Sequence, residues 1–211
     1  MSGDQMSGDH VMPRIAVVFY SATGNIAAMA EALAAGATEE GAQVRVRPVV
    51  ELAPAEAIDR NPRWRAWVEN NPYDETATLA DLEWADGIAL GSPTRFGGPA
   101  GQLKEFLDTT GGLWMQGKLV DKVGAAFTSA STRHGGLEST ILAMNNVFYH
   151  WGSIIVALGY TDPHLMESGN PYGGSFVSRR SAPPDDDALR ACRLQGARLA
   201  RITRQLVREA P

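Results

Sequence analysis

The sequence predicts an α/β fold, a doubly wound three-layer sandwich with a five-stranded parallel sheet in the order 2-1-3-4-5. Two observations carry this prediction. Short apolar runs alternate with segments of helical periodicity along most of the 211 residues, and the runs are apolar throughout rather than at every second position. Strands covered on both faces have this continuous apolar character, and strands separated by helices pair in parallel. The strand order is one common in such sheets.

The expected strands coincide with the apolar runs, at residues 15–20, 43–49, 87–91, 123–127 and 154–158. The expected helices carry apolar residues at three- and four-residue spacing, at residues 26–40, 101–110, 137–151 and 185–208. The last of these helices opens with acidic residues, which suit the positive end of the helix dipole. Residues 14–208 are therefore expected to form a single domain that is large enough for a full hydrophobic core.

Two segments interrupt the alternation of strands and helices. Residues 54–78 hold two tryptophans, a tyrosine and three prolines, and residues 160–184 are rich in glycine, proline and serine. Long insertions without a clear period are often functional or lie at interfaces. For the region around Trp64, an ordinary surface loop is the favoured interpretation.

Composition and charge argue against several classes of protein. The net charge of −5 provides no basic field for nucleic acid, and no apolar run is long enough for a membrane helix. Cys192 is the only cysteine, so no disulfide forms within the chain, and a packed, unreactive thiol is expected. The four histidines are scattered and give no metal-binding pattern. Residues 1–13 lack the features of a signal peptide and are expected to form a mobile tail of a cytoplasmic protein.

The first apolar run leads into a small hydroxyl-rich turn, and a helical pattern follows at once. A helix start offers unpaired N–H groups and a positive dipole end, Ser21 and Thr23 add hydroxyls, and Gly24 lets a ligand approach closely. The turn lacks the lysine of a P-loop and the three glycines of a dinucleotide fingerprint. It resembles the FMN-phosphate loop of flavodoxin-like proteins, although a plain turn capped by Asn or Thr also explains it.

Two further loops follow the third and fourth expected strands, at residues 91–100 and 129–136. Both are rich in glycine and small hydroxyl residues, and both precede helices. Ligands bind outside the carboxyl ends of parallel strands, so the three loops should meet at one site. A flavin ring suits exposed backbone N–H groups and flat apolar neighbours. Arg95 would stabilise the negative charge of the reduced ring and Phe96 would flank it, the alternatives being a surface salt bridge and loop packing.

Longer motifs carry a resemblance over residues 14 to about 208. They are Tyr20-Ser21-x-x-Gly24, Pro93-Thr94-Arg95-Phe96-Gly97, Gly101-Gln102, Phe106-Leu107-Asp108-x-Thr110-Gly111-Gly112-Leu113-Trp114 and Pro171-Tyr172-Gly173. Together these motifs resemble the WrbA-type NAD(P)H:quinone oxidoreductases, and the Pro-Thr-Arg-Phe-Gly and Thr-Gly-Gly-Leu-Trp segments are the specific ones. The resemblance implies a flavodoxin-like fold and a homotetramer that binds FMN.

The resemblance also implies an activity and a set of site residues. A hydride would pass from NADH or NADPH to FMN and then, with a proton, to a quinone, in a two-step ping-pong reaction that needs no obligate protein acid or base. Trp114 would form a wall beside the flavin for quinone or nicotinamide, and His150 would reach FMN from a neighbouring subunit. The implied FMN-binding residues are Ser21, Ala22, Thr23, Gly24, Asn25, Ile26, Pro93, Thr94, Arg95, Phe96, Gly97, Ser129, Ala130, Ser131, Thr132, Arg133, His134 and His150.

The chain departs from the family pattern in two loops. Thr23 stands where some members have a tyrosine assigned to the nicotinamide, and Asn25 stands where they have a histidine. Thr23 cannot stack on a nicotinamide, so only its phosphate role is kept. The loop at residues 129–136 is one residue longer than in some members. Its Arg133 is interpreted either as a ligand of an NADPH phosphate or as a solvated side chain.

Three other functions remain open at this point. A flavodoxin-type electron carrier would share the fold and cofactor, but such carriers are typically far more acidic and need no Thr-Gly-Gly-Leu-Trp segment. A non-enzymatic interaction protein would lack flavin or be inert toward NAD(P)H. An azo- or nitroreductase would share the cofactor and differ in the electron acceptor.

Overall fold

The computed structural model describes residues 11–179 and 182–209, so residues 1–10 of the expected tail lie outside the described residues. A six-stranded parallel sheet forms the middle layer, and five of its strands follow the order β2-β1-β3-β4-β5. This confirms the predicted fold class and strand order. The strands are β1 (Arg14–Phe19), β2 (Gln43–Pro48), β3 (Gly87–Pro93), β4 (Val123–Ala130), β5 (Ile154–Ile155) and β6 (Ser175–Val177).

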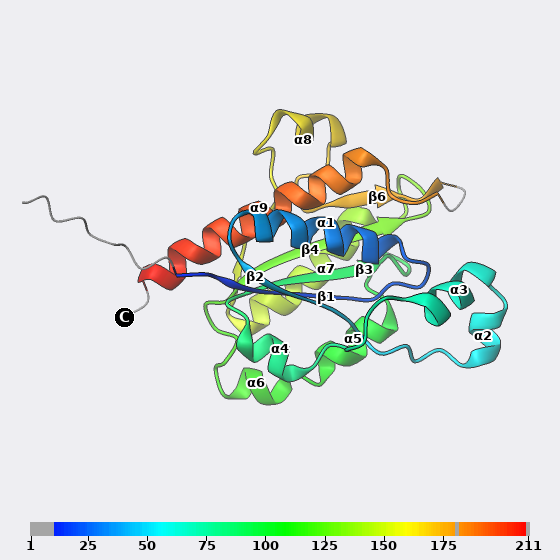
Figure 1. Cartoon of the computed structure of the whole chain (residues 1–211), viewed down its shortest axis with the longest axis horizontal. Helices are drawn as coiled ribbons and strands as arrows, with labels where there is room; N and C mark the ends of the chain where they lie inside the picture. Colours follow the sequence, from blue (N-terminus) through cyan, green and yellow to red (C-terminus); the bar gives the residue numbers. More distant parts are fainter. Residues whose placement is uncertain (1–10, 180–181, 210–211) are drawn as a thin grey trace, which may run out of the picture.

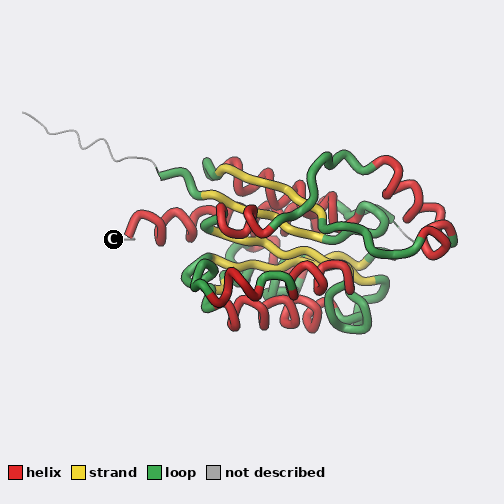
Figure 2. Tube along the Cα trace, turned by 90° about the horizontal axis from the view of Figure 1, so that it is seen from below, coloured by secondary structure: helices red, strands yellow, loops and turns green. Residues whose placement is uncertain are grey.

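Helices cover both faces of the sheet (Figure 1), and Figure 2 shows the strands between two helical layers. One layer consists of α1 (Asn25–Glu39) and α9 (Asp186–Glu209). The other layer consists of α4 (Leu79–Trp84), α5 (Gly101–Asp108), α6 (Gly111–Met115) and α7 (Leu137–Trp151). Alternate residues of the strands join one core or the other: Val17 packs in the core under α1 and α9, and Val18 in the opposite core.

The helices α1 and α9 approach each other closely through two glycines. A Cβ atom on Gly196 would stand 1.9 Å from the carbonyl oxygen of Leu33, and one on Gly36 would stand 2.0 Å from that of Arg193. The two backbones therefore meet where no side chain fits. Cys192 is fully buried in this layer, and burial raises the pKa of its thiol to about 12, as expected for a packed, unreactive cysteine.

The fifth position of the sheet differs from the prediction of a single strand over residues 154–158. Only Ile154–Ile155 pair with the start of β4, and the chain then leaves the sheet and forms α8 (Pro163–Ser168). It returns as β6, whose Ser175 pairs with Thr128 at the other end of β4. The edge of β4 is thus covered by two short segments, so the sheet has six strands instead of five. Three residues give too short a periodic pattern to predict β6 from sequence.

The region around Trp64 is helical and is not the ordinary surface loop favoured for it from the sequence. Residues 54–78 contain α2 (Ala55–Asp59) and α3 (Pro62–Asn70), which project beyond the carboxyl ends of the strands (Figure 1). The side chain of Asn61 caps α3, because its Oδ1 accepts from the N–H of Arg63 at 3.1 Å and of Trp64 at 3.4 Å. No helix in the described part of the chain has the length and apolar character that a membrane crossing requires.

Candidate functional site

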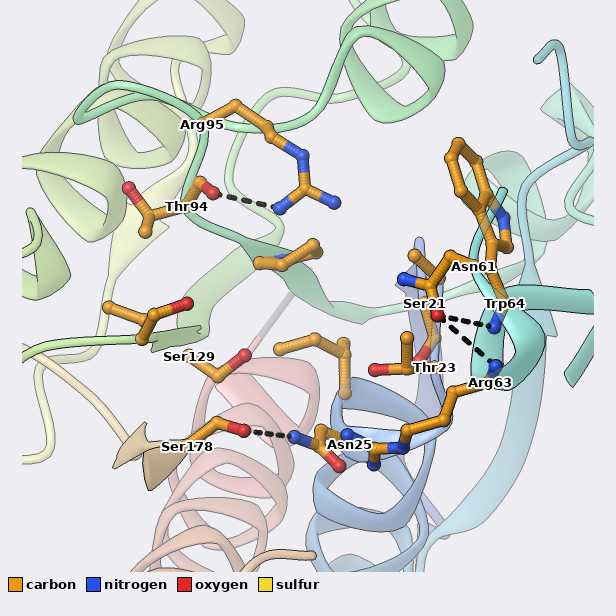
Figure 3. A pocket seen from close by; sticks show the side chains of 15 residues that line it. Ser21, Thr23, Asn25, Asn61, Arg63, Trp64, Thr94, Arg95, Ser129 and Ser178 are labelled. Carbon is orange, nitrogen blue, oxygen red and sulfur yellow. Dashed lines mark hydrogen bonds between the residues drawn. The ribbon is translucent and has the colours of Figure 1, made fainter. Parts of the chain in front are cut away.

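A cavity of about 320 Å³ opens at the carboxyl ends of β1, β3 and β4 (Figure 3). The three loops predicted to meet there supply most of its lining: Ser21, Ala22, Thr23, Asn25, Ile26, Pro93, Thr94, Arg95, Ser129, Ala130 and Ser131. The remaining lining residues are Asn61, Arg63 and Trp64 from the start of α3, and Ser178 after β6.

The β1–α1 loop is organised around the buried hydroxyl of Ser21. Its Oγ accepts hydrogen bonds from the N–H of Gly24 at 3.1 Å and of Ala27 at 3.4 Å. Gly24 has a φ of 87°, a left-handed conformation that few other residues adopt without strain. Asn25 Nδ2 donates to Ser178 Oγ at 2.9 Å, which joins the start of α1 to the segment after β6.

The β3–α5 loop brings Pro93, Thr94 and Arg95 to the cavity and directs Phe96 away from it. The N–H of Thr94 donates to Ser129 O at 2.8 Å, so this loop continues the pairing of β3 with β4. Arg95 Nη1 donates to Thr94 O at 2.9 Å. Arg95 and Gly98 pair through both backbone groups, and Phe96 at the tip of this turn is fully exposed with a φ of 54°. Gly97, next to it, is also outside the cavity lining.

The β4–α7 loop divides into two parts. The first part lines the cavity and consists of Ser129, Ala130 and Ser131. The N–H of Ser178 donates a hydrogen bond to Ala130 O at 2.7 Å. The next residues are exposed and do not line the cavity in this chain; they are Thr132, Arg133 and His134.

Sequence reasoning missed the residues of α3 that close the cavity beside the β1–α1 loop. Arg63 and Trp64 both line it, and Figure 3 shows the Arg63 side chain extending from α3 toward Asn25 at the start of α1. The Asn61-Pro62 pair was an available signal, since Asn is a favoured helix cap and proline is favoured at the first helical position. The signal predicts the helix, but not that the helix lies over the β1–α1 loop.

A polar cluster, here called the Glu51 network, holds α3 in place and consists of Tyr20, Glu51, Trp64 and Gln102. Glu51 Oε2 accepts from Trp64 Nε1 at 2.8 Å and from Tyr20 OH at 2.9 Å, and its Oε1 accepts from Gln102 Nε2 at 2.7 Å. Burial alone would raise the pKa of Glu51, but hydrogen bonds from the N–H of Ala53 and from these three side chains hold it below its usual value. Burial and the charge of Glu51 raise the pKa of Tyr20.

The electrostatic character of the cavity differs from that of the whole chain. The chain carries a net charge of −5, whereas the described residues that line the cavity include two arginines and no aspartate or glutamate. The other polar lining groups are hydroxyls and amides, together with the N–H groups at the start of α1. This donor set suits an anion.

Trp114 and His150 lie far from the cavity, at the other end of the sheet. Trp114 is in α6, which leads through Leu119 to the amino end of β4, and His150 is in the last turn of α7. Ser153 Oγ donates to Leu119 O at 2.9 Å, so the end of α7 adjoins the same region. The cavity lies at the carboxyl end of β4. Within one chain the structure therefore does not bring these two side chains to the other predicted site residues.

Comparison with known proteins adds to this geometry. The model of a family described as NADPH-dependent FMN reductase matches residues 13–161. The chain is 42% identical over 195 residues to a protein from Deinococcus radiodurans named NAD(P)H dehydrogenase (quinone), covering 92% of this chain and 97% of that protein. It is 42% identical over 200 residues to NAD(P)H dehydrogenase (quinone) 3 from Rhizobium meliloti, covering 90% and 92%.

Two solved structures share the fold of this chain. A flavodoxin, WrbA-like protein from Agrobacterium tumefaciens superposes with a TM-score of 0.66 at 26% identity, covering 92% of this chain and 98% of that one. A flavodoxin from the domain Archaea superposes with a TM-score of 0.60 at 22% identity, covering 90% and 98%, and this similarity concerns the fold alone.

Proposed function

This chain belongs to the NADPH-dependent FMN reductase family, and we propose that it is an FMN-dependent NAD(P)H:quinone oxidoreductase. The observation that carries the proposal is the cavity where the β1–α1, β3–α5 and β4–α7 loops meet, because its lining combines phosphate-binding and ring-binding elements. The relatives named NAD(P)H dehydrogenase (quinone) share about the full length of the chain and support both substrates.

The residues present fit FMN. The start of α1 and the Ser21 and Thr23 hydroxyls offer neutral donors for a phosphate, and the described lining includes no carboxylate that would repel it. The backbone of the β3–α5 loop and the side chains of Pro93 and Arg95 form the part of the cavity suited to the flavin ring. Residues 21–26, 93–97 and 129–134 remain proposed FMN ligands, although Gly24, residues 96–97 and residues 132–134 do not line the cavity of the single chain.

When bound, FMN would supply the chemistry of hydride transfer between NADH or NADPH and a quinone. The chain's residues bind and orient the reactants: transfer needs close stacking, so positioning accounts for most of the protein's contribution. The Arg95 guanidinium favours negative charge on the reduced ring. Trp64 supplies a flat aromatic wall that limits access of water from the α3 side. We propose that nicotinamide and quinone stack in turn on the same face of the ring, which gives the two-step ping-pong order.

We further propose that the functional unit is a homotetramer in the cytoplasm. Trp114 and His150 can serve as quinone wall and FMN contact only if another subunit brings them to the cavity. Exposed apolar side chains around them support such contacts, because Met115 is 75% and Tyr149 68% exposed in the single chain. Light scattering after size exclusion tests the assembly, and a monomer that binds FMN fully would contradict it. The single buried cysteine suits a reducing compartment.

An anaerobic titration tests the activity. FMN-loaded protein is titrated with NADH or NADPH and then with 1,4-benzoquinone, while flavin absorbance is recorded. We expect rapid bleaching by at least one nucleotide and complete recovery after quinone. A protein that binds FMN but is bleached by neither nucleotide would be an electron carrier instead. Bleaching without recovery by quinone would contradict the proposed acceptor.

A further inference from the structure

We propose that Arg63 binds the phosphate group of FMN and makes the cavity selective for FMN over riboflavin. This inference rests on the proposed function, because it requires FMN as the cofactor. It concerns a residue in the 54–78 insertion, outside the three loops that the sequence motifs identify.

Arg63 lies at the end of the cavity that is proposed to bind the phosphate. Arg63 lines the same cavity as Thr23 and Asn25, and its side chain extends from α3 toward the start of α1 (Figure 3). There the N–H groups of Asn25 and Ile26 donate to no other described residue. Free amides and a guanidinium thus converge on one region, and both favour a phosphate.

The Arg63 guanidinium has no competing partner among the residues that the structure describes. It makes no ion pair or hydrogen bond with another described residue, whereas Arg65 on the same helix pairs with Asp59 at 3.1 Å and Glu69 at 3.0 Å. Across the cavity, Arg95 already donates to Thr94 O. Among the described residues, Arg63 thus brings a guanidinium with free donors next to the start of α1, and a phosphate would accept two of them side by side.

Three contacts of α3 hold Arg63 near the start of α1. Asn61, two residues before Arg63, caps the helix, and Trp64 donates its indole N–H to Glu51. On the next turn, the Trp67 ring packs on Gly24, since a Cβ atom there would stand 3.4 Å from Trp67 Cε3. The helix thus rests directly on the β1–α1 loop, and Arg63 needs little reordering to meet a ligand.

FMN and riboflavin differ in charge, and this difference should reveal the role of Arg63. FMN carries a phosphate dianion, and a chain with a net charge of −5 repels it at long range. Riboflavin has the same ring and no phosphate, so it needs no compensating cation. An arginine at the phosphate end should therefore affect the two flavins differently, which makes the role of Arg63 separable from general effects on the cavity.

The test is the dissociation constant of FMN and of riboflavin, measured by flavin fluorescence quenching for the wild-type protein and three variants. We expect Arg63→Ala to weaken FMN binding about tenfold or more, and Arg63→Glu to weaken it further, because a charge-assisted contact is lost or reversed. Riboflavin binding should stay within about twofold of wild type, showing that the cavity is intact. The matched control is Arg60→Ala, an exposed arginine just before α3 that does not line the cavity.

Other results would overturn the proposal in recognisable ways. If Arg63→Ala and Arg60→Ala bind FMN equally well, or if Arg63→Ala weakens both flavins alike, Arg63 is not a phosphate ligand. If Arg63→Ala leaves FMN binding unchanged but raises the KM for NADPH and not for NADH, the phosphate it binds belongs to the nucleotide. A wild-type protein that binds neither flavin would refute the proposed function instead.

Discussion

The two sides of the cavity are built in different ways. The sheet side consists of the three loops after β1, β3 and β4, and backbone pairing fixes it: Tyr20 N–H donates to Gly91 O at 2.9 Å, and Thr94 N–H to Ser129 O at 2.8 Å. The α3 side consists of Asn61, Arg63 and Trp64, and none of the nine residues of α3 is buried. The sheet side is thus part of the folding core, whereas the α3 side depends on a few side-chain contacts and can be altered without unfolding the protein.

Disrupting the sheet side should have the largest effect on stability. A Cβ atom on Gly91 would stand 2.2 Å from Cζ of the fully buried Phe127. We expect Gly91→Ala to lower the free energy of unfolding by about 3 kcal/mol, because the ring has no space to move. Urea denaturation measures this. The control is Gly112→Ala in α6, where no atom lies within 4 Å of the added Cβ, and equal stability of the two variants would contradict the argument.

Disrupting the α3 side should weaken both folding and FMN binding, and by less than the Gly91 substitution weakens folding. Glu51→Gln converts one acceptor oxygen into a donor, so Trp64 or Gln102 loses its partner. We expect a loss of about 1–2 kcal/mol in the free energy of unfolding and about tenfold weaker FMN binding, as α3 loosens and Arg63 moves. Denaturation and fluorescence titration measure both. The control is Glu56→Gln, which changes an exposed residue of α2. If Glu51→Gln and Glu56→Gln bind FMN with equal affinity, the hydrogen bonds of Glu51 are not needed to position α3.

The same residue predicts a dependence on pH. The pKa of folded Glu51 lies below its usual value, which is about 4.3 in an unfolded chain. Its contribution to stability is therefore complete above that pH and is lost as the pH falls through the lower folded pKa. Thermal unfolding between pH 7 and pH 3 should show a steeper acid decline for wild type than for Glu51→Gln. The pKa of Asp81 is also lowered, so its contribution to stability is lost at acid pH in both proteins. Parallel curves for wild type and Glu51→Gln would therefore exclude a contribution from Glu51.

The smallest expected effect concerns the exposed tip of the β3–α5 loop. Phe96 adopts a φ of 54° without burying its ring. Left-handed backbone disfavours residues with a Cβ, so Phe96→Gly should be more stable than Phe96→Ala by about 1 kcal/mol. Melting temperatures measure the difference between these two variants, which both lack the ring. If they melt together, the left-handed backbone at position 96 carries no strain.

Most of the sheet could be predicted from the sequence because each of its central strands is a continuous apolar run between helices. The runs at 15–20, 87–91 and 123–127 give the buried strands, and parallel pairing then places their loops at one end. That end is where the structure brings Ser21, Thr94 and Ser129 together. The same reasoning could not divide the fifth position into β5 and β6, because two- and three-residue strands carry no measurable period.

Sequence information sufficed wherever local pattern and burial agree: the α/β class and the positions of the three glycine- and hydroxyl-rich loops follow from the apolar runs, and the strand order is the one common in such sheets. It did not suffice where a contact joins segments that have no shared pattern. Trp64 donates to Glu51, 13 positions away, and Trp67 packs on Gly24, 43 positions away. In neither pair does the sequence around one residue predict the other. The position of Arg63 depends on these contacts, so it emerged from the folded chain, because side-chain packing between distant segments leaves no periodic trace in the sequence.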